Sequence, residues 1–309
     1  GVRRSLRPIV WKYQLRYWPV GCNLQTRRRI DLAKTQEYMR LKQKWIAWIP
    51  FLRVNEDDPA VEASASEDAH ADSSQAPTPE QLSKLRDAWT RIEKDITRTD
   101  MDLPFYNGQG NADTRPGSAA SAPSPIPQCP RTCPRVAKGS NTEKLRDVLL
   151  TYVLSVEGDD AAQGYVQGMN DLMSPLLQVF NGDEVATFWC YTEFMRRTHN
   201  NFRVDGKGMS LHLEILHDLF HYADPGFMAH LDALQAGHLF FCYRWLLVWF
   251  KREFSSRAVQ SIWEVLWTDY GTKDLLYFFA LAIVTEHRDA IVRHLLNFEE
   301  VLKYINDLS

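Results

Sequence analysis

The sequence lacks both a phosphate-binding loop and an apolar run of membrane-spanning length. Nowhere in its 309 residues does the pattern G-x-x-x-x-G-K-[ST] occur, so the chain has no ready-made cradle of its own for nucleotide phosphates. The apolar runs 239–250 and 275–284 are far shorter than the roughly 20 residues of a membrane helix, and Arg244 interrupts the first. The sequence therefore predicts no transmembrane segment, and any nucleotide must arrive on a partner.

An excess of basic residues is also missing, and cysteines are few. The 36 Lys and Arg residues against 39 Asp and Glu residues give a formal net charge of −3. This balance provides no basic field for nucleic acid, so we expect a protein partner and no nucleic acid. The five cysteines form an odd set without framework spacing, which is typical of a reducing compartment and predicts a cytoplasmic protein. They are Cys22, Cys129, Cys133, Cys190 and Cys242.

No complete set of metal ligands is evident either. His217 and His221 lie one helical turn apart, as the paired ligands of zinc peptidases do, so a helical metal hydrolase is one alternative function. However, Asp218 stands where such enzymes carry glutamate, and the sequence positions no third ligand. Cys129 and Cys133 likewise have no second pair. We therefore expect no metal site and no cofactor of the chain's own.

What the sequence does have is helical periodicity, with no sustained alternation of apolar and polar residues. Thr78, Pro79 and Gln81 form a helix start, with Thr78 as the N-cap and Gln81 able to close a capping box. An apolar stripe at helical spacing follows, made of Leu82, Leu85, Trp89, Ile92 and Ile96. The fold class that these patterns predict is all-α.

Further helices are predicted by the same spacing, together with two insertions. Residues 55–76 are rich in Ala, Ser and acidic residues, and residues 108–140 are rich in Pro, Gly and Ser. Neither segment has enough apolar area to offset the entropy of ordering it, so both are expected to be disordered surface insertions. The expected helices are 142–156, 170–180, 183–199, 210–222, 237–251, 255–267, 272–286 and 297–308.

Two short motifs carry polar residues at the ends of predicted helices. Residues 92–99 have the pattern I-x-x-D-x-x-R-T, and residues 165–171 have the pattern Y-x-Q-G-M-x-D. Three other segments accompany them in order: L-R-P-I-V-W-K at 6–12, P-F-Y at 104–106 and F-C-Y-R-W at 241–245. In this combination the chain resembles the TBC domain, the catalytic module of Rab GTPase-activating proteins.

The resemblance implies one large helical TBC domain over residues 1–309, built of two helical subdomains. It implies that the partner is a Rab-family small GTPase in its GTP-bound state, which itself holds GTP and Mg²⁺. An arginine supplied in trans accelerates such hydrolysis by on the order of 10³ to 10⁵. Vesicle trafficking and a peripheral place on endomembranes, through the Rab, also follow from the resemblance.

The same resemblance assigns roles to the motif residues. Arg98 is expected to act as the arginine finger and Gln167 as a glutamine finger that orients the attacking water. Asp95, which is three positions before Arg98 and therefore its neighbour on a helix, is expected to orient it. Tyr165 is expected to position Gln167, and Asp171 flanks it. Five further residues are expected to be structural or partner-facing: Arg7, Trp11, Thr99, Asn170 and Arg244.

Other interpretations of these residues remain open. Taken alone, Arg98 is half of a surface ion pair with Asp95, and Gln167 is a polar group in a glycine-containing turn. A Rab-binding adaptor with this fold and no catalysis is therefore the main alternative function. Arg244 lies inside an apolar run, where an unpaired charge is costly, so we expect a buried ion pair that braces the surface.

Overall fold

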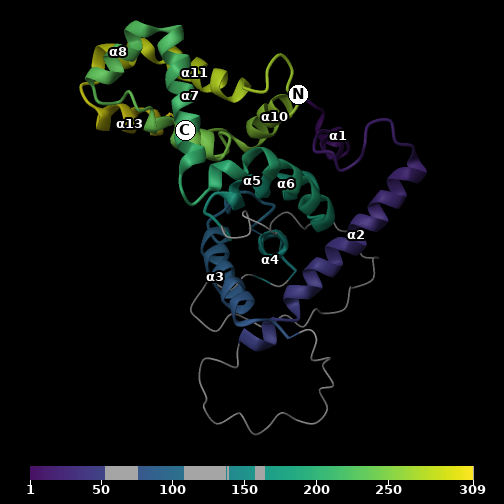
Figure 1. The fold of residues 1–309 in the computed structure, drawn as a ribbon. Coiled ribbons are helices and arrows are strands. Elements are labelled where there is room, and N and C mark those ends of the chain that lie inside the picture. The colour runs from purple at the N-terminus through teal and green to yellow at the C-terminus, as the bar shows by residue number, and fades with distance from the viewer. Residues whose placement is uncertain (53–75, 108–136, 138, 157–163, 309) are drawn as a thin grey trace, which may run out of the picture. The chain divides into compact units, whose positions relative to one another are not determined.

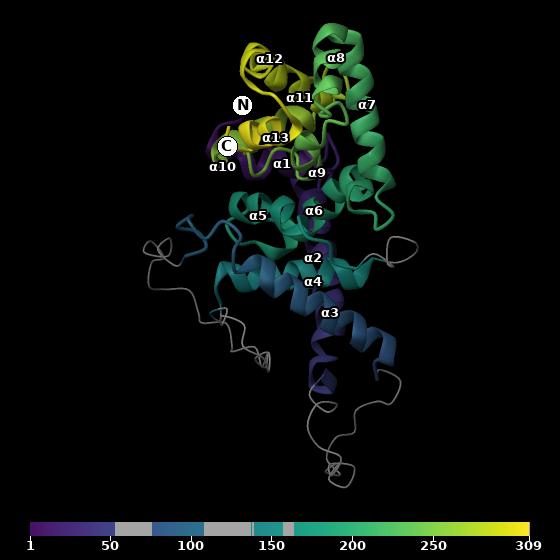
Figure 2. The same cartoon turned by 90° about the vertical axis from the view of Figure 1, so that its left-hand side faces the viewer.

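The computed structural model describes residues 1–52, 76–107, 137, 139–156 and 164–308. In these ranges every regular element is a helix, which confirms the all-α prediction (Figures 1 and 2). The two predicted insertions, 55–76 and 108–140, lie almost entirely outside the described residues. No helix in the described ranges is both long and apolar enough to cross a membrane.

The α-helices follow one another along the chain with short 3-10 helices between some of them. They are α1 (Arg7–Gln14), α2 (Leu24–Ile46), α3 (Pro79–Ile96), α4 (Asn141–Ser155), α5 (Met169–Val179), α6 (Glu184–Thr198), α7 (Lys207–Ala223), α8 (Pro225–Ala233), α9 (Tyr243–Leu247), α10 (Ser256–Leu266), α11 (Leu275–Glu286), α12 (Arg288–His294) and α13 (Phe298–Asn306).

Helix α3 begins as the sequence predicts. The Thr78 side chain accepts a hydrogen bond from the Gln81 amide, and the Gln81 side chain accepts one from the Thr78 amide, which completes the capping box. The apolar stripe faces the core, where Leu85, Ile92 and Ile96 are fully buried. The helix ends at Ile96, so Arg98 lies in the turn that follows it.

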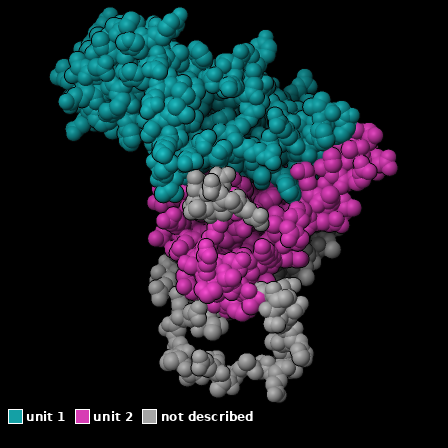
Figure 3. All heavy atoms as spheres, in the orientation of Figure 1, with its two compact units in different colours: residues 1–22, 171–180, 189–309 teal, residues 23–170, 181–188 magenta. Residues whose placement is uncertain are grey.

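The chain divides into two compact units, which Figure 3 shows in different colours. Unit 2 comprises residues 23–170 and 181–188, and it contains α2, α3 and α4. Helix α4 packs against both α2 and α3. In its core the indole rings of Trp45 and Trp89 meet edge to face at 6.1 Å, and Trp45 Nε1 donates to the Thr151 hydroxyl at 2.9 Å.

Unit 1 comprises residues 1–22, 171–180 and 189–309. Its core is rich in aromatic side chains. The Phe194 ring makes edge-to-face contacts with Trp249, Trp263 and Trp267, at centroid distances of 4.9 to 5.2 Å. Trp11 adds a further edge contact to Trp267 at 4.8 Å. Such pairs stabilise a core beyond the apolar area that they bury.

The expected helix over 237–251 is wrong. That stretch contains only a 3-10 turn at Phe240–Cys242 and the five-residue α9. Leu239, Trp249 and Phe250 have φ angles of 52°, 48° and 60°, a left-handed conformation that ends helical geometry at both sides. Three short helices, α1, α8 and α12, were not expected, although Asp224 caps α8 and Pro225 is its first residue.

Candidate functional site

Arg98 lies in the turn that follows α3, with its side chain 71 % exposed. Its Nη2 donates to Asp95 Oδ1 at 3.2 Å, and its Nε donates to the main-chain oxygen of Lys94 at 3.1 Å. The neighbour relationship that the spacing predicts for Asp95 and Arg98 is therefore present. A guanidinium has five N–H donors, so these bonds leave three of them directed to solvent.

Gln167 is exposed in a short turn that leads into α5. Its side-chain amide forms no hydrogen bond within the described part of the chain. The next residue, Gly168, has a φ of 103°, which side-chain-bearing residues rarely adopt. The Gly168 amide donates to Asn170 Oδ1 at 3.1 Å, so the turn is held from its α5 side.

A buried hydrogen-bond network links this turn to the end of α3. The Tyr165 hydroxyl lies 2.8 Å from Asp95 Oδ2 and 2.9 Å from Asn170 Oδ1, and it can donate its single proton to one of them at a time. Asn170 Nδ2 donates to the Thr99 hydroxyl at 2.8 Å, and that hydroxyl donates to the Asp95 carbonyl at 2.7 Å. The network is closed, and Tyr165, Asn170 and Thr99 are all buried.

Four residues that the sequence singles out form this network: Asp95, Thr99, Tyr165 and Asn170. The exposed Arg98 is bonded to it directly. Asp95 uses one carboxylate oxygen for Arg98 and the other for Tyr165. Asn170 and Thr99, expected only as structural or partner-facing residues, occupy its centre. The arrangement offers a permanently charged fork and a neutral amide on a rigid base, which suits charge stabilisation and orientation of a water molecule rather than proton transfer.

Asp171 does not contact this network through any described hydrogen bond. It belongs to unit 1, where its Oδ2 accepts from Nη2 of Arg252 at 2.7 Å and from Nε of Arg252 at 3.2 Å. Asp171 is buried and therefore needs such a partner. Sequence reasoning missed Arg252, because nothing in the chain signals a partner 81 positions away.

Arg7 and Trp11 converge on one buried carboxylate in unit 1. Arg7 Nε donates to Glu264 Oε1, and Trp11 Nε1 donates to the same oxygen at 3.1 Å. Arg7, Trp11 and Glu264 are 6 %, 0 % and 3 % exposed, respectively. These side chains therefore join α1 to α10 and are not available to a partner. Glu264 was not predicted from the sequence.

Arg244 forms the ion pair that the sequence demands, but only one side of it is buried. Its Nε and Nη2 donate to the two carboxylate oxygens of Glu253 at 2.6 and 2.7 Å. The Glu253 side chain is 6 % exposed, whereas that of Arg244 is 36 % exposed. The expectation of a fully buried pair is corrected accordingly: the charged fork of Arg244 reaches the surface.

The proposed metal ligands do not assemble into a site in the described residues. Within those ranges no group of three or more His, Cys, Asp or Glu side chains is placed to hold a metal ion. The rings of His217 and His221 lie parallel, with centroids 6.3 Å apart, on the outer side of α7. Cys129 and Cys133 lie outside the described residues.

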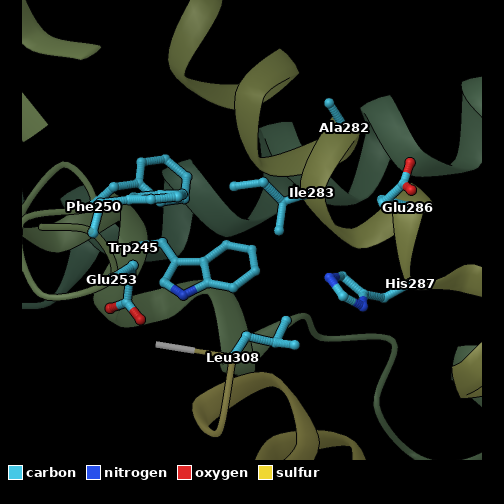
Figure 4. A pocket seen from close by; sticks show the side chains of 9 residues that line it. Trp245, Phe250, Glu253, Ala282, Ile283, Glu286, His287 and Leu308 are labelled. Carbon is cyan, nitrogen blue, oxygen red and sulfur yellow. The ribbon is translucent and has the colours of Figure 1, made fainter. Parts of the chain in front are cut away.

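A cavity of about 500 Å³ lies within unit 1, between α11 and the segment around Trp245 (Figure 4). Apolar side chains form most of its wall, including Trp245, Phe250, Ile283 and Leu308. Its buried carboxylate, Glu253, is already engaged by Arg244. Neither Arg98 nor Gln167 lines this cavity, so it has no part in the arrangement described above.

Comparisons with known proteins agree with this fold. A family model described as the Rab-GTPase-TBC domain matches residues 127–292. The chain is 35 % identical over 305 residues to the GTPase-activating protein GYP7 of Candida glabrata, covering 99 % of this chain and 36 % of that protein. It is 32 % identical over 310 residues to human TBC1 domain family member 17, covering 100 % of this chain and 39 % of the relative.

The fold also resembles that of a solved structure, the YPT/Rab-GAP domain of Gyp1p. The TM-score is 0.67 at 19 % sequence identity, over 99 % of this chain and 82 % of the other. At that identity the likeness concerns the fold alone. The chain spans little more than a third of the length of the curated relatives that it matches.

Proposed function

The chain belongs to the Rab-GTPase-TBC domain family, and on that premise we propose that it accelerates GTP hydrolysis on a Rab-type GTPase. The observation that carries the proposal is the pairing of Arg98 and Gln167. Both side chains are exposed; Arg98 is hydrogen-bonded to Asp95 of the buried network, and the turn that carries Gln167 is joined to the same network by the bond from the Gly168 amide to Asn170. An adaptor that only binds has no need of such an arrangement.

The proposed mechanism is stabilisation of charge and of the attacking water in trans. Hydrolysis places negative charge on the phosphoryl oxygens, and a planar guanidinium matches these oxygens with a bidentate fork. Arg98 supplies that fork. The Gln167 side-chain carbonyl accepts a hydrogen bond from the attacking water, while its amide group donates to the phosphoryl oxygen or the partner's backbone.

Releasing Arg98 for this task costs little. In its ion pair with Asp95 the Arg98 side chain is 71 % exposed and that of Asp95 is 11 % exposed. Ion pairs open to solvent contribute weakly to stability because water and salt screen them. Asp95 keeps its bond to Tyr165 when Arg98 swings out. The network therefore holds the end of α3 in place during the exchange. GTP and Mg²⁺ are proposed to be held by the partner, and the chain is proposed to need no cofactor.

A panel of GTP-loaded Rab GTPases, assayed one at a time for phosphate release, tests the proposal. We expect strong acceleration of at least one member by the chain, and loss of that acceleration with Arg98→Ala. Binding to a GTP-loaded Rab without acceleration would instead support the adaptor. The proposed place of action is the cytoplasm, on endomembranes only through the bound Rab.

A further inference from the structure

We propose that Arg91 is a positioning residue for Gln167, acting through the main chain that enters the Gln167 turn. The inference rests on the proposed function. Arg91 Nη1 donates a hydrogen bond of 3.3 Å to the carbonyl oxygen of Tyr165, a residue 74 positions further along the chain. Tyr165 lies two positions before Gln167. The bond therefore connects α3 to the backbone on the entry side of the turn.

The two sides of the turn are held by different groups. On the exit side the Gly168 amide donates to Asn170 Oδ1. On the entry side the Tyr165 ring is buried, but a buried ring does not by itself fix the orientation of the following peptide plane. Two bonds hold that peptide: the Arg91 guanidinium donates to the Tyr165 carbonyl from α3, and the Val166 amide donates to Met169 Sδ at 3.4 Å. Arg91 is therefore the group outside the turn and α5 that directs the Tyr165 carbonyl. The backbone before Gln167 is therefore bonded to α3, and the backbone after it, at Gly168, is bonded to Asn170 of α5.

Arg91 also lies on the helix that leads to Arg98. Arg91 lies in the second half of α3 and Arg98 in the turn that follows this helix, and both are exposed. Lys94 lies between them in the sequence and is also exposed, and its side chain forms no hydrogen bond or ion pair in the described residues. Lys94 is therefore a matched control: it carries the same charge on the same face without touching the turn.

Steady-state kinetics test the inference on whichever GTP-loaded Rab the unmodified chain accelerates most. We expect Arg91→Ala to lower kcat by about 10-fold with little change in KM, since small displacements of a positioned group reduce rates strongly. Arg91→Lys, which keeps a donor and the charge, should recover part of the loss. In a Gln167→Ala background, Arg91→Ala should lower kcat by less than about twofold, because the group that it positions is gone.

Two results would overturn the inference. One is an equal loss of kcat from Arg91→Ala in the parent chain and in the Gln167→Ala background, and the other is a loss of kcat from Lys94→Ala as large as that from Arg91→Ala. Either result shows that Arg91 acts through its charge. Amide hydrogen exchange provides a readout that needs no partner. Arg91→Ala should speed exchange of the amides at 165–169, whereas Lys94→Ala should not. Unchanged amide exchange at 165–169 in Arg91→Ala also overturns the inference. Failure of the proposed function would be a different result, in which the unmodified chain accelerates no Rab.

Discussion

The hydroxyl oxygen of Tyr165 lies 2.8 Å from Oδ2 of Asp95, across 70 positions of sequence. This contact joins the end of α3 to the turn before α5, and it leaves the other oxygen of Asp95 for Arg98. The exposed side chains of Arg98 and Gln167 therefore share one buried support. A change in that support is expected to affect both side chains together.

Tyr165→Phe removes the hydroxyl and keeps the buried ring. We expect a loss of about 1–2 kcal/mol in the free energy of unfolding, because the one donor that Asp95 Oδ2 and Asn170 Oδ1 share is removed. We also expect a fall of about 10-fold in kcat on the accelerated Rab. Urea unfolding and phosphate release measure the two effects.

Tyr38→Phe is the matched control for that variant. Tyr38 is also buried in unit 2, but its hydroxyl donates to Glu184 at 2.6 Å. Glu184 is not part of the buried network that contains Asp95 and Tyr165. Tyr38→Phe should lose stability while kcat stays within about twofold of the parent. If the two variants lowered kcat equally, the support attributed to Tyr165 would be refuted.

Gly168→Ala tests the backbone conformation of the turn. With φ at 103°, an added Cβ is strained whatever space surrounds it, so we expect a cost of about 1–2 kcal/mol and reduced activity. Gly226→Ala provides the comparison: Gly226 lies in α8, and an added Cβ there meets its nearest atom at an ordinary 3.6 Å. That variant should be neutral or slightly stabilising. Thermal midpoints and phosphate release distinguish the outcomes, and equal behaviour would contradict the strain argument.

Stability should depend on pH through His212. Burial lowers the pKa of the His212 imidazole below its usual value of 6.5. The ring lies between the Tyr277 hydroxyl at 2.7 Å and Asn201 Oδ1 at 2.8 Å. Because the unfolded chain binds the proton more readily, this contribution is fully present above pH 6.5 and is lost as pH falls towards the lowered value.

Urea midpoints at pH 7.5 and pH 5.5 measure that dependence. The parent should be less stable at the lower pH, and His212→Gln should reduce the difference between the two midpoints. His221→Gln, which changes an exposed ring on the same helix, should not reduce it. An unchanged difference in His212→Gln would show that another group controls stability in this range.

The sequence predicted the structural features that depend on residues close together in the chain. The capping box of Thr78 and Gln81 and the apolar stripe of α3 depend on residues a few positions apart, and both are present. The helix predicted over 237–251 is wrong because Leu239, Trp249 and Phe250 take left-handed backbone conformations. In residues other than glycine, such conformations cannot be recognised from the sequence. The apolar run there gave no other indication of its breaks.

The supporting contacts of the site were harder to predict for a related reason. Asn170 stands inside a recognisable motif, but its central role depends on Thr99, 71 positions away. Asp171 was expected beside Gln167 and instead pairs with Arg252. Proximity in sequence gave no information on either partner, since such pairings arise only when helices pack.

Phosphate release from one accelerated Rab, compared for the parent, Arg98→Ala, Arg98→Lys, Gln167→Ala and the double alanine variant, tests the central claim most directly. We predict that Arg98→Ala lowers kcat/KM by on the order of 10² to 10⁴ and that Arg98→Lys is nearly as poor, because an ammonium cannot form the bidentate fork. The double variant should lose less than the sum of the single losses in free energy. Near-normal acceleration by Arg98→Ala, with its helical circular dichroism intact, would contradict the account.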